Sequence, residues 1–489
     1  MSTNAKSTQL KSLGAVLALL AFAQMIIAID YNIVFVSLPE IGSGLGFSEY
    51  NLQWVVSAYA VAFGGFLMLG GRATDLFGRK RMFIVGMALY AISSLVGGLA
   101  TEPWILVVAR AVQGLGGAFL APATLSLVMA LFKEGAERNQ ALSIWGAAGG
   151  SGMVLGSILG GVLTDAFGWP AVFFVNVLLA GAGVIAAWVL IPADPPSARG
   201  KIDLPGAVTG TAGVTLLVFA LVEAPARGWT SSFVLTTAAV AVLLLGVFIA
   251  VEARSSAPML PLRLFRNRNL STGTLITFSF MATFGALAYF LTRYWQGVLG
   301  YSAWTTGLAF VLPSASVLIG TVLGGKLSTK FGVRSTLVGA LAVGAAGTAV
   351  LALVAGPTSS YLAIAPALVV LSVAQGVVFT TMFVAATTGV EAADQGIGSG
   401  IATTGQQIGG AVGLAVLIAI ATSVNSGGDG NTVMHETTVA YWAIAIGIAV
   451  TVLVTLNFRQ RPPAEPVNGA DAAGSLDTVE TASEGVQPR

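Results

Sequence analysis

The sequence contains no cysteine, a single histidine and few charged residues. Without cysteine, the chain has no disulfide and no thiolate ligand for a metal ion. His435 stands alone, which leaves no histidine cluster for a metal site or a proton relay. Charged residues make up 9% of the 489 residues, whereas soluble domains carry about 25%. A chain so poor in charge does not have the surface of a soluble protein.

Motifs of nucleotide-driven and hydrolytic enzymes are also missing. The chain has no glycine-rich loop that ends in Gly-Lys-Ser/Thr, and no nucleophile paired with histidine. We therefore expect no enzymatic activity and no cofactor. Active transport by such a chain would draw on an ion gradient, and the residues leave open whether protons or sodium ions supply it.

Hydrophobic residues take the place of the missing charge. They make up 55% of the chain, and the mean hydropathy is +0.86. The apolar runs are about twenty residues long, which is enough for helices to cross roughly 30 Å of hydrocarbon. The sequence predicts an all-α integral membrane protein with fourteen spans. They lie near residues 13–38, 51–70, 82–100, 104–131, 140–163, 170–192, 205–223, 233–252, 270–296, 304–324, 335–355, 361–388, 398–424 and 439–458.

The spans divide into groups of six, two and six. We predict a six-helix bundle at residues 1–192, a linker with two extra membrane helices at 193–268, and a second six-helix bundle at 269–458. The tail at 459–489 is polar, contains proline and acidic residues, and has no apolar period. Such a composition predicts a disordered segment, here on the cytoplasmic side.

Basic residues are distributed unevenly between the two sides of the membrane. With the N-terminus inside, all of the 23 Lys and Arg residues fall in cytoplasmic segments except Arg110, Arg227 and Arg293. Positive charge concentrates on the cytoplasmic side of membrane proteins. The count therefore predicts that both termini are cytoplasmic, and it supports an even number of spans.

A basic, glycine-punctuated loop at residues 70–81 recurs at residues 324–334. Both copies have two glycines, a basic residue and then Phe-Gly, and the dipeptides Gln113-Gly114 and Gln375-Gly376 also match between the halves. A charged stop between two spans is the alternative, but a stop has no reason to recur in this way, whereas a duplicated transporter has. We predict a gate on the cytoplasmic side, formed by Gly71, Asp75, Gly78, Arg79 and Lys80.

Asp75 distinguishes the first copy of this loop from the second, where Thr329 stands. We expect Asp75 to act as a latch that stabilises the outward-open state. Its expected partners are cations such as Arg79, or the N-terminus of a helix across the interface.

These motifs resemble those of the major facilitator superfamily, and in particular its fourteen-span drug:proton antiporters. Residues 71–80 match the signature between spans two and three, and residues 110–117 match the Arg-x-x-Gln-Gly signature of span four. Residues 30–41 resemble the span-one signature, and residues 169–176 resemble the opening of span six. The resemblance covers nearly the whole chain except the tail. It implies a major facilitator fold of two six-helix bundles plus two extra central helices.

Residues 152–161 resemble the span-five antiporter signature, Gly-x-x-x-Gly-Pro-x-x-Gly-Gly, with Ser157 in place of the proline. The family associates this signature with export. The substitution removes a proline kink. The antiporter-type glycines Gly152, Gly156, Gly160 and Gly161 remain, and they can let helices approach closely.

Two opposite charges lie inside predicted spans. Asp30 is about 12 Å below the outer end of span one and Arg110 about 9 Å into span four, at 1.5 Å per residue. Charges at such depth face a cavity or pair with each other, and they are functional by default. We predict that Asp30 and Arg110 couple transport to protons as a protonation switch. The alternative is a static structural ion pair.

Polar and amphipathic side chains inside the apolar runs suit a cavity for an amphipathic substrate. Amides are the strongest candidates, because a polar side chain that faces lipid is costly. Arg293, near the end of its span, either lines the cavity or extends to the headgroups. The predicted lining is Gln24, Met25, Asn32, Tyr59, Phe63, Gln113, Trp145, Asn176, Tyr289, Arg293, Gln375, Gln406 and Gln407.

The resemblance implies a multidrug efflux transporter that exchanges lipophilic or cationic drugs or toxins for protons by alternating access. The alternatives are a proton-coupled exporter of an endogenous metabolite, antibiotic, lipid or amino acid with the same fold, and a non-transporting receptor or channel. We expect a monomer in the inner or plasma membrane of a bacterium. Its partners would be a small amphipathic substrate, protons and membrane lipids, and no nucleic acid.

Overall fold

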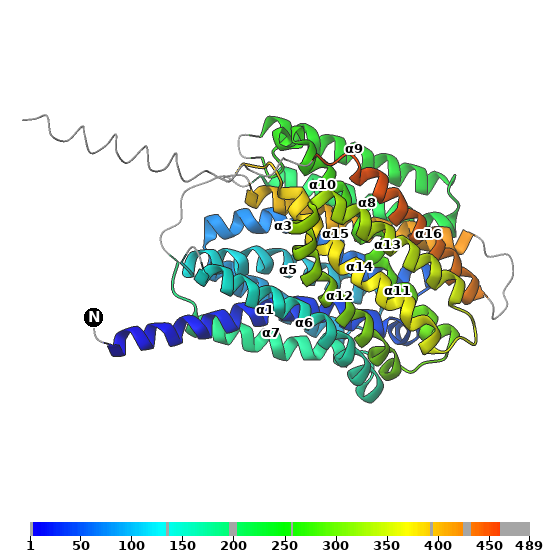
Figure 1. Ribbon diagram of the computed structural model, residues 1–489, viewed down its shortest axis with the longest axis horizontal. Helices are drawn as coiled ribbons and strands as arrows, with labels where there is room; N and C mark the ends of the chain where they lie inside the picture. The colour runs from blue at the N-terminus through cyan, green and yellow to red at the C-terminus, as the bar shows by residue number, and fades with distance from the viewer. Residues whose placement is uncertain are drawn as a thin grey trace, which may run out of the picture. The chain divides into compact units, whose positions relative to one another are not determined.

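The computed structural model describes residues 3–133, 136–194, 203–255, 258–391, 395–423 and 432–459, and these residues are helical throughout apart from short connections (Figure 1). The predicted tail at 459–489 lies outside the described residues except for Arg459. The first half contains α1 (Thr3–Leu45), α2 (Glu49–Leu52), α3 (Trp54–Phe77), α4 (Arg79–Gly98), α5 (Pro103–Leu131), α6 (Ala136–Phe167) and α7 (Ala171–Leu190). The helices α8 (Leu204–Arg227) and α9 (Ser232–Arg254) follow. The second half contains η1 (Leu262–Arg266), α10 (Arg268–Thr283), η2 (Phe284–Ala286), α11 (Leu287–Thr292), η3 (Arg293–Val298), α12 (Ala303–Phe331), α13 (Val333–Val354), α14 (Tyr361–Thr387), α15 (Gln395–Ser423) and α16 (Thr432–Thr455).

Fourteen of these helical stretches are long and apolar enough to cross a membrane, which confirms the predicted number. Thirteen are single α-helices, and the ninth, Arg268–Val298, is assembled from α10, η2, α11 and η3. The 3-10 turn η2 contains Gly285, where an added Cβ would lie 2.7 Å from the sulfur of Met281. Serine side chains cap the starts of several spans, as Ser231 does for α9 and Ser360 for α14. Local sequence signals therefore set where the spans begin.

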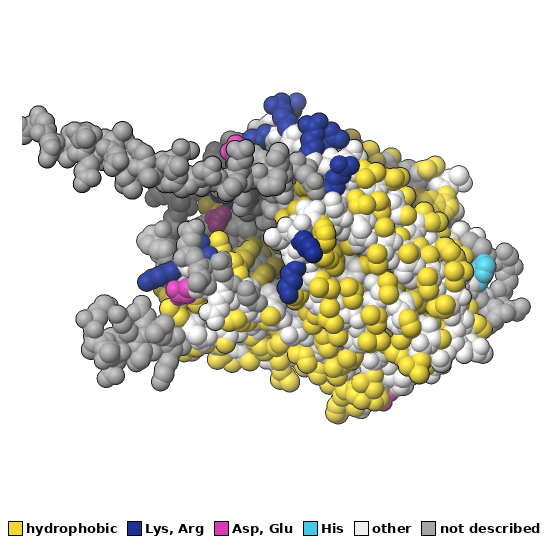
Figure 2. All heavy atoms as spheres, in the orientation of Figure 1, with side chains coloured by type: hydrophobic (Ala, Val, Ile, Leu, Met, Phe, Trp, Pro, Cys, Tyr) yellow, Lys and Arg dark blue, Asp and Glu magenta, His cyan; other side chains and the backbone are white. Residues whose placement is uncertain are grey.

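The two ends of the helical unit differ in charge. We call the end at which α1 begins and α16 ends the basic face, because most described Lys and Arg side chains lie on segments at that end. In Figure 2 the dark blue side chains lie toward that end, and hydrophobic side chains cover the middle. On the other end, which we call the opposite face, Arg227 pairs with Glu223 and Arg293 pairs with Glu436.

The two halves repeat the same helix crossing. An added Cβ at Gly70 of α3 would lie 2.0 Å from the carbonyl oxygen of Ala118 on α5, and one at Gly320 of α12 would lie 2.1 Å from that of Val373 on α14. The turns that follow also match, because Gly78 and Gly332 both have positive φ, 98° and 81°. Only glycine adopts this backbone conformation without strain. The repeated loop of the sequence is therefore a repeated structure.

The antiporter-type glycines of α6 form a contact line along α1. Added Cβ atoms at Gly152, Gly156 and Gly160 would lie 2.6–2.8 Å from the carbonyl oxygens of Met25, Ile29 and Ile33, respectively. Small residues at four-residue spacing let two helix backbones come this close. Ser157, which replaces the family's proline, donates from Oγ to the Met153 carbonyl at 3.1 Å. The helix α6 runs unbroken through this position.

At the opposite face the two halves contact each other through α6 and α12. An added Cβ at Gly161 of α6 would lie 2.8 Å from the carbonyl oxygen of Ala303 at the start of α12, and one at Gly307 would lie 2.6 Å from that of Ser157. Gln296 also donates from Nε2 to the Val36 carbonyl of α1 at 2.8 Å. Toward the basic face, Gly146 of α6 and Gly325 of α12 have no neighbour within 4 Å of an added Cβ. The seam between α6 and α12 is therefore closed at the opposite face.

The extra helix α8 covers a second seam, between α3 and α15. Val214, Val218 and Val222 of α8 pack with Ala60 of α3 and Ala411 of α15 in one apolar cluster. The helix α9 packs on α8 and lies at the edge of the bundle in Figure 1. The inserted pair is thus attached to both halves at this seam.

We expect that Gly156→Ala will destabilise the protein, because its methyl group would overlap the Ile29 carbonyl and push α1 away from α6. Overpacking of this kind costs about 1–3 kcal/mol. Gly146→Ala, on the same helix, is the control, because nothing lies within 4 Å of its added Cβ. Thermal unfolding of the purified variants in detergent will compare them. Equal melting temperatures for the two variants would contradict the contact line.

Candidate functional site

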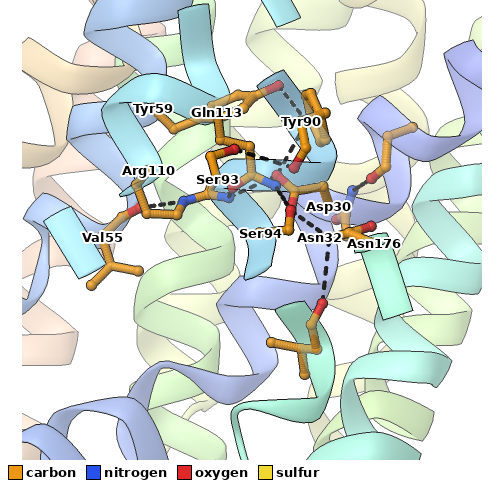
Figure 3. Close-up of polar contacts among 12 residues, drawn as sticks. Asp30, Asn32, Val55, Tyr59, Tyr90, Ser93, Ser94, Arg110, Gln113 and Asn176 are labelled. Carbon is orange, nitrogen blue, oxygen red and sulfur yellow. Dashed lines mark hydrogen bonds and ion pairs between the residues drawn. The ribbon is translucent and has the colours of Figure 1, made fainter. Parts of the chain in front are cut away.

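Asp30 lies in the interior of the first half, where it forms a buried ion pair with Arg110. Its Oδ2 is 2.7 Å from Arg110 Nη1, and the side chains are 0% and 2% exposed. Asp30 is on α1 and Arg110 on α5, seven residues after that helix begins. The depth estimate from sequence placed both charges at one level, and the structure brings them into direct contact (Figure 3).

Three further side chains donate hydrogen bonds to the Asp30 carboxylate. Gln113 Nε2 and Asn176 Nδ2 donate to Oδ1 at 2.8 and 2.7 Å. The hydroxyl of Tyr90 donates to Oδ2 at 3.2 Å. With Arg110, four donors surround a carboxylate that water does not reach. Such a set satisfies the hydrogen-bonding capacity of a carboxylate that is buried away from water.

Arg110 is also held at several points. Its Nε donates to the carbonyl of Val55 at 2.8 Å, and Nη1 donates to Gln113 Oε1 at 2.6 Å. The guanidinium lies over the ring of Tyr59, 4.6 Å from the centroid. These contacts fix the arginine even without Asp30. A change in the charge of Asp30 would therefore leave a positioned, buried cation that needs another partner.

Five helices of the first half supply the site: α1, α3, α4, α5 and α7. Sequence reasoning missed the contribution of α4, which places Tyr90 beside Asp30 and Ser94 Oγ 2.9 Å from Gln113 Nε2. Polar residues four apart share one face of a helix. The pair Tyr90 and Ser94 inside an apolar span was the signal that could have revealed this face.

Two of the predicted cavity residues, Gln113 and Asn176, donate hydrogen bonds to Asp30 in this structure. Both are 1% exposed or less, and their amide groups donate to the carboxylate. In this structure a buried charge is the partner of both amides, and their role as cavity lining stays a prediction. Tyr59 belongs to the same cluster, since its hydroxyl is 3.0 Å from that of Tyr90. Phe63 is buried and stacks on Tyr59, with ring centroids 5.8 Å apart.

The other predicted lining residues are spread over both halves. Gln24 contacts Gly149 of α6, Asn32 donates to the Ala28 carbonyl, and Gln407 packs on Gly64 at the seam between α3 and α15. Tyr289 is buried against Phe290. Met25, Trp145 and Gln375 are partly buried, and Gln406 is buried. The structure does not bring this set together around one cavity.

Arg293 was predicted to line the cavity or to reach the headgroups. It instead donates from Nη2 to Glu436 Oε2 of α16 at 3.0 Å, and the Glu436 side chain is 4% exposed. A buried charged side chain is more stable next to a charge of opposite sign than next to lipid. Glu436 is a lone acid at the start of the last span. No sequence pattern connects it to Arg293.

A small apolar pocket lies between the halves. Tyr31, Phe35, Val56 and Ala60 line it from α1 and α3, and the second half contributes the remaining four residues: Gly285, Ala286, Gly410 and Leu414. Tyr31 follows Asp30 in the chain, and consecutive residues point about 100° apart around a helix. The helix α1 therefore presents Asp30 to the interior of the first half and Tyr31 to the pocket.

In the loop at residues 71–80, the start of α4 contacts an acid from another part of the sequence. Asp194, at the end of α7, accepts the backbone N–H groups of Arg79 and Lys80 at 3.0 and 2.9 Å. Lys80 Nζ donates in return to the carbonyls of Trp188 and Ile191. Gly78 gives the carboxylate room, because an added Cβ would lie 2.5 Å from Asp194 Oδ2.

Asp75, in contrast, is exposed, and no hydrogen bond or ion pair of its side chain occurs among the described residues. An added Cβ at Gly71 would lie 4.0 Å from the Cβ of Pro122 on α5. The start of α4 is thus capped by Asp194, an acid that lies more than a hundred residues away in the chain. The latch role of Asp75 remains a prediction about another conformation.

The two similar halves, the fourteen spans and the buried ionic site define a membrane transporter and not an enzyme. A family model described as the Major Facilitator Superfamily matches residues 20–414. A cephamycin export protein from Amycolatopsis lactamdurans is 37% identical over 94% of this chain and 96% of its own length. The puromycin resistance protein of Streptomyces alboniger is 34% identical over 90% of this chain and 88% of its own length.

The solved structure of the nucleoside transporter NupG has the same fold. It matches with a TM-score of 0.65 over 91% of this chain and 99% of that chain, at 12% identity. The chain belongs to the major facilitator superfamily. It is related to drug and antibiotic efflux proteins within it, as the sequence motifs predicted.

We expect Asp194→Ala to lower the free energy of unfolding by about 1 kcal/mol, the usual cost of losing a helix N-cap. Asp75→Ala, in the loop that Asp194 contacts, is the control, and it should cost less because Asp75 is exposed. Thermal unfolding of the two purified variants will rank them. A larger loss for Asp75→Ala would show that Asp194 is not the residue that holds the start of α4.

Proposed function

We propose that this transporter exports lipophilic or cationic drugs or toxins in exchange for protons. The observation that carries the proposal is the buried Asp30 carboxylate with its fixed Arg110 partner. Asp30 is the one carboxylate that the described residues contribute to this five-helix site, and Val55 and Gln113 hold the arginine by contacts that do not involve the acid. In such an arrangement, protonation of Asp30 breaks its ion pair with Arg110.

The helix α1 is the element that would transmit this event. Protonation of Asp30 weakens its attraction to Arg110 on α5, while Tyr31 and Phe35 on the same helix line the pocket between the halves. The glycine line of α6 follows α1 along its length. A small movement of α1 would therefore change both the pocket between the halves and the seam between α6 and α12.

The distribution of positive charge assigns the two sides of the membrane. We take the basic face as cytoplasmic, because positive charge concentrates on that side. The closed seam at the opposite face then lies on the outer side of the membrane, which is the arrangement of a state that is not outward-open. In this state no hydrogen bond or ion pair of the Asp75 side chain occurs among the described residues, which agrees with a role for residues 71–80 as a gate that closes in the outward-open state.

A second candidate is export of an endogenous product, such as an antibiotic made by the same cell. The relative that favours it is the cephamycin export protein, whose name describes the export of an antibiotic. The puromycin resistance protein favours a drug substrate by its name. The two candidates share the fold and the proton site and differ only in the compound that is exported.

We expect Asp30→Asn to reach the membrane but to lose gradient-driven transport, because asparagine cannot take up a proton. Uptake of a panel of lipophilic dyes and antibiotics, added outside everted vesicles, will be measured with and without a proton uncoupler. The control is Asp165→Asn, which changes an exposed acid of α6. Uptake by Asp30→Asn vesicles at the wild-type rate would refute the proton role, and wild-type uptake that is insensitive to the uncoupler would refute proton exchange itself.

A further inference from the structure

A chain of two tyrosine hydroxyls leads away from Asp30. Tyr90 OH is 3.2 Å from Asp30 Oδ2, and Tyr59 OH is 3.0 Å from Tyr90 OH (Figure 3). The rings come from α4 and α3, and both are 1% exposed or less. These hydroxyls are buried polar groups whose hydrogen bonds are with each other and with the carboxylate.

The neighbours of Asp30 differ in whether they can exchange a proton with it. Oδ1 faces the amide nitrogens of Gln113 and Asn176, which donate and have no free lone pair. The orientation of Gln113 is set, because its Oε1 accepts from Arg110. Oδ2 faces Arg110, which also only donates, and Tyr90, whose hydroxyl both donates and accepts. Among the described residues in contact with the carboxylate, Tyr90 alone can hand it a proton or take one.

The direction of the hydrogen bonds follows from counting protons. Tyr90 has one hydroxyl proton and uses it to donate to Asp30 Oδ2. Its contact with Tyr59 must therefore be a bond that Tyr90 accepts and Tyr59 donates. The chain runs from Tyr59 to Tyr90 to the ionised carboxylate. When Asp30 carries a proton on Oδ2, the same chain can run in reverse.

From this geometry we propose that the Tyr90 and Tyr59 hydroxyls are the proton port of Asp30, a proposal that rests on the proposed proton exchange. In one concerted step the Tyr90 O–H bond breaks as the Asp30 Oδ2–H bond forms. The Tyr59 proton moves to Tyr90, and a hydronium ion from water restores the proton of Tyr59. Each hydroxyl ends with one proton, Asp30 gains one, and no tyrosinate is formed.

The charged and titratable groups around the port are few. Arg110 of α5 faces both Asp30 and the ring of Tyr59, and Tyr31 of α1 lies next to Asp30 in the chain. The contact from α7 is the neutral amide of Asn176. On the far side of the port, Gly117 lies beside the Tyr59 hydroxyl, since an added Cβ would be 3.2 Å from it. The ring of Phe63 lies closer still, 2.7 Å from the same added Cβ, so Gly117 and Phe63 border the outer end of the tyrosine pair.

The test follows the protonation of Asp30 directly and needs no transport substrate. The purified full-length protein in lipid nanodiscs is subjected to a rapid drop in pH, and time-resolved infrared absorption records the carbonyl stretch of protonated carboxyl groups. The band of Asp30 is the one that Asp30→Asn lacks. We expect Tyr59→Phe to slow its appearance roughly tenfold or more, as loss of a positioned proton donor does, without changing its final amplitude. Tyr90→Phe should slow it further.

The control is Tyr441→Phe, which removes a buried hydroxyl from α16 in the other half and should leave the rate unchanged. A wild-type rate in Tyr59→Phe, with the Asp30 band present, would overturn the port and leave the proton role of Asp30 intact. Absence of the Asp30 band in the wild type would overturn both proposals. A merely structural role of Tyr59 would reduce the amplitude rather than the rate, and this result also counts against the port.

A measurement on the wild type alone covers the case in which Tyr59→Phe does not fold. The rate of appearance of the Asp30 band is measured in mixtures of light and heavy water. A chain that moves several protons in one step predicts a curved dependence of the rate on the deuterium fraction. A straight line would indicate a single proton in flight and would overturn the concerted chain.

Discussion

The structure depends on how it accommodates one carboxylate in a region without water. Removing an ion from water costs several kcal/mol, and a charge partner offsets this cost only with good geometry and further hydrogen bonds. Asp30 has both, through Arg110 at 2.7 Å and three more donors. Five helices of the first half are arranged to supply these groups. The interior of that half is thus organised around a polar site and not around apolar packing alone.

The helix α1 connects this site to the rest of the molecule. One of its faces carries Asp30, and another carries Tyr31 and Phe35 at the boundary between the halves. Its backbone rests against the glycine line of α6, where no side chain separates the two helices. Contacts that are this close transmit small displacements, because packed interiors do not deform continuously. The glycines of the antiporter-type signature therefore have a physical role even with Ser157 in place of the proline.

Hydropathy and charge were sufficient to predict the fourteen spans, because helix length and composition follow from the bilayer. The approach of Asp30 and Arg110 also followed, since both charges lie at one depth. The rotation of each helix did not follow, so Gln113 and Asn176 were assigned to a cavity and Tyr90 was missed. Asp194 was missed for another reason: its contact with residues 79 and 80 joins segments far apart in sequence, and no local pattern encodes it. Sequence thus located the charges, and the structure identified their partners.

The central claim is that the ion pair is a switch and not a static bridge. Spin labels on the opposite-face ends of α6 and α12, next to the contact of Gly161 with Ala303, report whether that seam is open. Distance distributions at acidic and alkaline pH, without substrate, test the claim most directly. The account predicts a pH-dependent shift in the wild type that is absent in Asp30→Asn. An unchanged wild-type distribution, or an equal shift in Asp30→Asn, would contradict it.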